Sequence, residues 1–95
     1  MLVIVIYVNE QEVRSISARV WGQRIRTLRK SRYLTQQDLA DAIAASTGDT
    51  LHRSAVAHWE TGRHEPALRH RRAIAVALGC PADLLFEVPA EVTAA

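Results

Sequence analysis

Residues 46–66 read STGDTLHRSAVAHWETGRHEP, and the helix predicted inside this stretch decides the fold. Thr50 is placed to cap the start of the helix, and Gly62 is placed to end it. Four apolar residues share one helical face: Leu51, Ala55, Val56 and Trp59. Because a buried indole supplies much of a small domain's apolar contact, we expect Trp59 to be a core residue. The opposite face of this helix is left for a partner.

Four more helices are predicted around this segment. The first covers about 13–31, and the second covers about 36–46 with Thr35 as its cap and Asp38 at its third position. The fourth follows Pro66, ends at Gly79 and turns Leu68, Ala73, Ile74, Ala77 and Leu78 inward. A short fifth helix has Pro81 at its first position. The predicted fold class is therefore all-α, a compact five-helix domain over 13–87 preceded by one short β-strand.

The N-terminal residues 1–12 are predicted to form a strand or arm. The run LVIVIYV at 2–8 is rich in β-branched residues, and it is too short for a membrane span and lacks the flanks of a signal peptide. Two copies could pair across a two-fold axis and make a homodimer. Alternatively the strand pairs within its own chain, and dimerisation uses the fifth helix or occurs only on DNA. Residues 88–95 are expected to be a flexible tail.

Charge is concentrated in the middle of the chain. The net charge of the 95 residues is only +2, yet residues 13–72 hold all 12 Lys and Arg and five of the ten acids, a local balance of +7. Clustered cations are typical of proteins that bind a polyanion, because phosphate contacts release condensed counterions. An Arg-rich solvated surface is the alternative explanation. The single cysteine requires no oxidising compartment, so we expect a cytoplasmic protein.

Three segments in the right order resemble one known family. They are RIRTLRKSRYLTQQDLADAI at 24–43, SAVAHWETGRHEPA at 54–67 and AIAVALGCPADLL at 73–85. Together they resemble the lambda-repressor-like helix-turn-helix family, which includes phage repressors, Cro proteins and xenobiotic-response-element-type regulators. The resemblance covers about residues 20–87. The sequence departs from the family pattern at 44–49, AASTGD, where about six residues are inserted before the third helix.

This resemblance implies a sequence-specific regulator that binds double-stranded DNA. The recognition helix, about 50–61, would lie in the major groove, where base edges present distinguishable donors and acceptors. The residues expected to contact bases are Arg53, Ser54, Ala57 and His58. Those expected to contact phosphates are Thr35, Gln36, His52, Arg63 and His64. The family also implies a salt bridge between Arg29 and Glu60. Arg53 could otherwise be a solvated charge, and Ser54 could simply cap the helix.

No catalytic, metal or cofactor site is expected. The histidines at 52, 58, 64 and 70 recur every six residues, a spacing that on one helix turns about 240° and separates neighbouring rings. Two functions from different classes remain. The first is a phage-type repressor or Cro-like protein that occludes a promoter. The second is an antitoxin or protein-interaction module that binds a toxin or polymerase subunit through the strand or the fifth helix.

Overall fold

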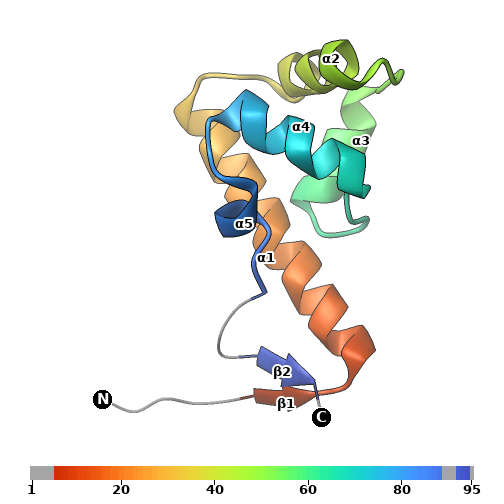
Figure 1. Cartoon of the computed structure of the whole chain (residues 1–95), viewed down its shortest axis with the longest axis vertical. Coiled ribbons are helices and arrows are strands. Elements are labelled where there is room, and N and C mark those ends of the chain that lie inside the picture. Colours follow the sequence, from red (N-terminus) through yellow and green to blue (C-terminus); the bar gives the residue numbers. More distant parts are fainter. Residues whose placement is uncertain (1–5, 89–91, 95) are drawn as a thin grey trace.

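Five helices form the body of the protein, as predicted. The computed structural model describes residues 6–88 and 92–94. In chain order the elements are β1 (Ile6–Val8), α1 (Glu10–Ser31), α2 (Gln36–Thr47), α3 (Arg53–Glu60), α4 (Leu68–Leu78), α5 (Ala82–Leu85) and β2 (Val92–Ala94). Helices α2, α3 and α4 gather around the second half of α1, and the two strands lie at its opposite end (Figure 1).

The long first helix begins earlier than expected, at Glu10 instead of residue 13. Asn9 caps it, because its side-chain oxygen accepts a hydrogen bond of 2.8 Å from the backbone N–H of Glu12. Glu10 and Glu12 stand in the first turn, where their negative charges interact favourably with the positive end of the helix dipole. The Asn-x-x-Glu spacing is the sequence signal for this start.

Helix α2 has the predicted cap and ends within one residue of the predicted position. The Thr35 hydroxyl accepts a bond from the N–H of Asp38 at 3.0 Å, and the Asp38 carboxylate accepts one from the N–H of Thr35 at 2.8 Å. These bonds lower the pKa of Asp38. The helix continues to Thr47 and ends at Gly48, whose φ is 78°. Residues 44–47, most of the segment that the family resemblance predicts as an insertion, therefore form about the last turn of α2.

Helix α3 is shorter than the predicted recognition helix. It covers Arg53–Glu60, and its cap is His52, so the prediction of Thr50 as cap is wrong. His52 has an extended backbone, and its ring Nδ1 accepts a hydrogen bond of 3.3 Å from the backbone N–H of Ser54. A histidine ring can replace a hydroxyl here because it offers the same acceptor to an unpaired helix amide.

The predicted inward face of α4 is wrong at its first residue. The Leu68 side chain is 77% exposed, whereas His70 is buried. Residues two apart on a helix point to nearly opposite sides, so only one of them can face the core. The helix ends as expected at Gly79, which has a φ of 64°. We predicted Pro81 at the first helical position of α5. In the structure it is the cap residue, and the helix begins at the next residue, Ala82.

The core is shared by all five helices. Trp59 is 5% exposed, which confirms it as a core residue. Its fully buried neighbours are Ile25, Leu39, Ile43, Val56, Ile74, Leu78 and Leu85. Gly22 lets α1 approach the end of α3 closely, because a Cβ at this position would collide with the carbonyl oxygens of Trp59 and Glu60. A larger residue would push the two helices apart.

A buried ion pair joins α1 to α3. Arg29 and Glu60 form the salt bridge that the family resemblance implies: Nε lies 2.6 Å from Oε2, and Nη2 lies 3.0 Å from Oε1. Both side chains are at most 10% exposed. The Arg29 guanidinium also donates a bond of 2.8 Å to the carbonyl of Leu34, in the turn before α2. The hydrogen bonds to Glu60 raise the pKa of Arg29, although burial opposes this.

The two strands pair with each other in parallel. Ile6 is opposite Val92, and Val8 is opposite Ala94. Residues 6–8 thus pair within their own chain, which is the second of the two arrangements considered for the N-terminal strand. Residues 2–5 of that strand lie outside the described residues. Residues 92–94, which we expected in a flexible tail, form the partner strand.

Replacing Gly22 by alanine should destabilise the protein by about 3 kcal/mol, because the new methyl group would overpack the contact between α1 and α3. Gly48→Ala is the matched control. It also adds one methyl group but meets open space, so only its positive φ should cost stability, about 1 kcal/mol. Urea unfolding measures both, and equal losses in the two variants would contradict the close approach at Gly22.

Replacing Arg29 by alanine should cost about 3 to 5 kcal/mol of unfolding free energy, because Glu60 would remain buried without its partner. The control is Arg26→Ala, which removes an exposed cation from the same helix and should change stability by about 0.5 kcal/mol or less. Chemical denaturation of the three proteins gives the answer. A loss in Arg29→Ala as small as in the control would show that the pair does not hold α1 and α3 together.

Candidate nucleic-acid interface

One side of α3 is open to solvent. Arg53 and Ser54 are exposed, Ala57 and His58 are half-buried, and Val56 and Trp59 are buried on the other side. The structure therefore brings the four predicted base-contacting residues together on one face. A helix with such a face fits the major groove, whose width admits an α-helix.

His52 and Ser54 are tied to each other at the start of this face. The His52 Nδ1 lies 3.1 Å from the Ser54 hydroxyl and also accepts from the Ser54 N–H. His52 was predicted as a phosphate contact, and its place is at the N-terminal end of α3. With Nδ1 used as an acceptor, the neutral ring carries its proton on Nε2, where it can donate outward.

The start of α2 offers a second group of candidates. Thr35 is exposed, but Gln36 is half-buried, and its amide donates a bond of 3.3 Å to Glu60 Oε1. Gln36 is thereby connected to the ion pair between Arg29 and Glu60. This contact was not predicted, because it joins residues 24 positions apart and needs the folded arrangement of α2 and α3.

The turn after α3 places the remaining two candidates beside the recognition helix. Arg63 and His64 are exposed, and both backbone N–H groups donate to the carbonyl of His58, at 2.9 and 3.3 Å. The rings of His58 and His64 lie 5.1 Å apart, centroid to centroid, at 75°. The expectation that successive histidines lie apart is wrong for this pair, because the chain turns back at Gly62, whose φ is 77°.

Charge on these surfaces favours an anionic partner. Within the described residues, no acid lies within ion-pair distance of Arg53 or Arg63. The acids that do form ion pairs meet other cations, such as Arg69, which pairs with Asp49. Two exposed cations on α3 and on the turn after it are therefore available for phosphates or base edges.

A group of three residues beside α3 was missed by sequence reasoning. Asp49 accepts a hydrogen bond from Arg69 Nε at 2.7 Å, and its Oδ2 lies 2.7 Å from His70 Nε2. The hydrogen bond from Arg69 has the largest effect on the pKa of Asp49, and together with the contact of His70 it lowers that pKa. The residues are about 20 positions apart, so periodicity within one helix gives no signal for them.

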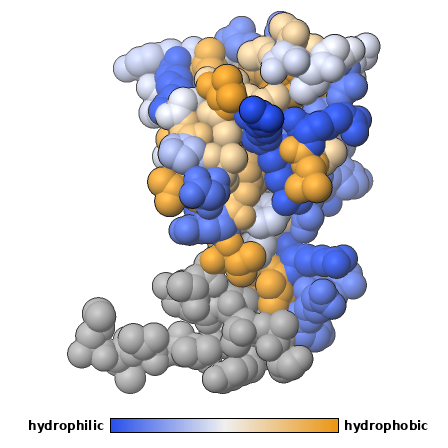
Figure 2. All heavy atoms as spheres, in the orientation of Figure 1, coloured by the Kyte–Doolittle hydropathy of each residue, from blue (hydrophilic) through white to orange (hydrophobic). Residues whose placement is uncertain are grey.

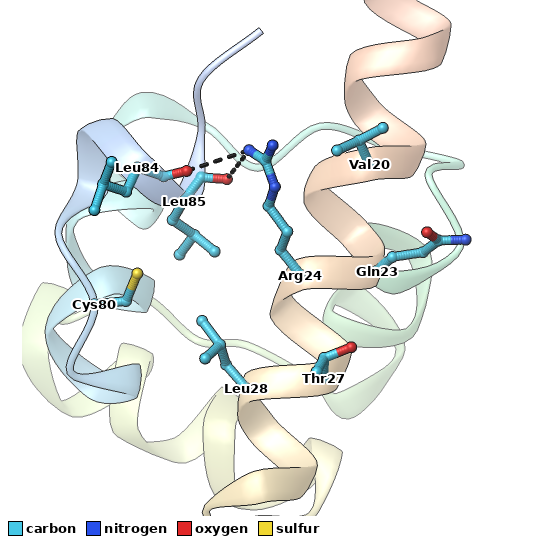
Figure 3. A pocket seen from close by; sticks show the side chains of 8 residues that line it. All are labelled: Val20, Gln23, Arg24, Thr27, Leu28, Cys80, Leu84 and Leu85. Atoms are coloured by element: carbon cyan, nitrogen blue, oxygen red, sulfur yellow. Dashed lines mark hydrogen bonds between the residues drawn. The ribbon is translucent and has the colours of Figure 1, made fainter. Parts of the chain in front are cut away.

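A largely apolar pocket of about 440 Å³ lies between α1 and α5, away from α3 (Figure 3). Val20, Leu28 and Leu85 line it, and Arg24 closes one side by donating to the carbonyls of Leu84 and Leu85, at 3.2 Å each. Figure 2 shows apolar side chains reaching the surface among hydrophilic ones. The exposed aliphatic residues of α4, α5 and the segment after it are Leu68, Val76, Leu84 and Val88.

None of the described helices is long and apolar enough to cross a bilayer. Within the same residues, no three side chains among His, Cys, Asp and Glu come close enough to hold a metal ion. His70, the fourth histidine, is buried against Trp59, with 5.7 Å between the ring centroids.

Comparison with known proteins gives the family. The profile of a family described as helix-turn-helix matches residues 25–85. A solved structure, the restriction-modification controller protein C.AhdI from Aeromonas hydrophila, is similar with a TM-score of 0.64 and 31% sequence identity. The similarity covers 75% of this chain and 98% of that chain. No curated protein matched the chain.

The matched residues include α2, α3, α4 and α5 completely, together with the last third of α1, which carries Arg29. The chain therefore belongs to the helix-turn-helix family of lambda-repressor-like and xenobiotic-response-element-type DNA-binding transcriptional regulators, which are not enzymes.

Proposed function

We propose that the protein regulates transcription by binding a specific double-stranded DNA site with α3 in the major groove. The observation that carries this proposal is the exposed Arg53 on α3, which has no acid partner among the described residues. A guanidinium can bond guanine O6 and N7 together, which is the commonest specific contact in this groove. Ser54, Ala57 and His58 complete the reading face.

Phosphate contacts on both sides of α3 would set its orientation. Thr35 and Gln36 stand at the positive end of α2, which favours a phosphate. Arg63 and His64 follow α3, and His52 can donate from Nε2 at its start. Such contacts position a protein on DNA without reading its sequence.

The similarity to C.AhdI favours one kind of regulator. The sequence alone favoured a phage-type repressor or a Cro-like protein that occludes a promoter. Because the similarity covers 98% of a restriction-modification controller protein, we propose that this chain has such a controller role. Occupation of a promoter remains the simplest action for a protein that binds DNA through a single helix-turn-helix.

We also propose that two copies bind together. One recognition helix reads only a few base pairs, so proteins of this kind use two half-sites about one helical turn apart. Leu84 is 56% exposed beside the apolar pocket between α1 and α5, and its burial against a second copy would be favourable. Since β1 pairs with β2, this surface is the better candidate for the dimer.

Arg53→Ala should weaken binding to the preferred site by about 1–3 kcal/mol and relax selection at one base position in each half-site. Selection from random DNA duplexes at two salt concentrations, with both proteins, measures this. The control is Arg72→Ala on α4, which removes an exposed cation outside the reading face and should leave the selected motif unchanged. Weak, motif-free binding by the wild-type protein that disappears with salt would instead favour the antitoxin or protein-interaction alternative.

Leu84→Glu should reduce the mass in solution from two chains to one, because a carboxylate would be buried in an apolar interface. Leu68→Glu, an equally drastic change at an exposed position on α4, should keep the dimer mass. Sedimentation equilibrium distinguishes the two. If Leu84→Glu stays dimeric and a chain without residues 1–9 becomes monomeric, the dimer uses the strands instead.

A further inference from the structure

The first two residues of α3 have no direct contact with the hydrophobic core. The buried residues of α3 are Val56, Trp59 and Glu60, the first of which is its fourth residue, and the half-buried Ala55 also packs against the core. Arg53 and Ser54 are exposed, so the core holds them only through the residues that follow, Ala55 and Val56. Specific contacts need side chains held within about 0.5 Å of their productive positions. Contacts on the N-terminal side of this helix are therefore needed to fix its first two side chains as closely as the later ones.

The segment before α3 is held by Asp49 at two points. Its backbone N–H donates a bond of 3.2 Å to the Thr47 hydroxyl, at the end of α2. Its carboxylate lies 2.7 Å from both Arg69 Nε and His70 Nε2, at the start of α4. Only residues 50–52 then separate this fixed point from the first residue of α3. Leu51 in this link packs half-buried against the core, so the core and Asp49 together set the direction in which the chain enters α3.

The same contacts lead on to the far end of α3. His70 is 7% exposed, and its ring packs on Trp59 at 5.7 Å between centroids. Asp49, which precedes α3, and Trp59, in the last turn of α3, therefore meet the same histidine. Charge-assisted hydrogen bonds of this kind are short and directional, so they can fix an angle as well as a distance.

We propose that Asp49, held by Arg69 and His70, is a positioning residue that sets the placement of Arg53 and Ser54 in the major groove. The clamp formed by these three residues lies where the sequence carries its insertion, 44–49. The clamp ties the end of this segment to the start of α4, three residues before α3 begins. The inference about DNA specificity rests on the proposed function, whereas the ordering of α3 by the clamp does not.

Two measurements test the proposal on Asp49→Asn, with Asp41→Asn as the matched control. Asp41 is an exposed acid on α2 whose carboxylate accepts a hydrogen bond only from Gln37 among the described residues. In the free protein, amide hydrogen exchange from Ala55 to His58 should be roughly tenfold faster in Asp49→Asn, as expected for the loss of one charge-assisted hydrogen bond. The control should exchange like the wild type.

The second measurement is the ratio of specific to non-specific DNA affinity. Removing an acid favours DNA binding electrostatically, so both variants should bind random DNA equally well or better. Only Asp49→Asn should lose affinity for the selected site, by roughly tenfold. The loss of charge and the loss of positioning thus change the affinity for the selected site in opposite directions, so the measurement distinguishes them. Arg69→Ala against Arg72→Ala repeats the test with the charge reversed, since both are exposed arginines of α4 and only Arg69 binds Asp49.

The outcomes are separable. Unchanged exchange in α3 of Asp49→Asn would overturn the proposal, even if the wild-type protein selects a DNA motif. Faster exchange with an unchanged affinity ratio would overturn the link to specificity. Faster exchange in a protein that selects no motif would confirm that the clamp orders α3 and reject the proposed function. If Asp49→Asn unfolds, Arg69→Ala, altered at an exposed side chain, supplies the same comparison.

Discussion

The arrangement of α1, α2 and α3 depends on the buried pairing of Arg29 with Glu60. The guanidinium binds the carboxylate of α3 with two nitrogens and the turn before α2 with a third. Gln36 adds a bond from α2 to the same carboxylate. A lysine could not make these contacts, because its ammonium lacks the planar fork of donors. Each of these buried charges is stable only where the other lies beside it. The pair and its hydrogen bonds therefore fix the positions of α1, α2 and α3 relative to one another.

On α3 and α1, the side chains that pack inside the protein differ from those that reach the surface or the end of another helix. On α3, Val56 and Trp59 face the core while Arg53 faces the solvent. On α1, Gly22 and Ile25 face the other helices, and Arg24 reaches the carbonyls that end α5. The surface proposed for DNA and the surface proposed for a second copy therefore lie on different helices. A substitution on one of these surfaces removes no side chain from the other.

Sequence reasoning was reliable where a single helix contains the whole signal. The capping box of Thr35 and Asp38, the stop at Gly79 and the burial of Trp59 were all predicted from spacing and residue type. The ion pair between Arg29 and Glu60 came from the family resemblance. Errors arose where two local choices compete, such as Leu68 against His70 for the inward face of α4. Contacts between distant segments, such as Asp49 with His70 or β1 with β2, have no periodic signature, because they depend on how the helices pack.

The pairing of the two strands has a consequence for the order of folding. Ile6 and Val92 lie 86 positions apart, so their pairing closes nearly the whole chain into a loop, whereas each helix needs only contacts four residues away. Contacts of such long range form late, because the entropy of closing the loop is lost before the pairing contributes any stabilisation. The helical domain can therefore assemble while both ends are still unpaired. Loss of the two short strands should then mainly accelerate opening of the chain ends and leave the folding rate of the helices almost unchanged.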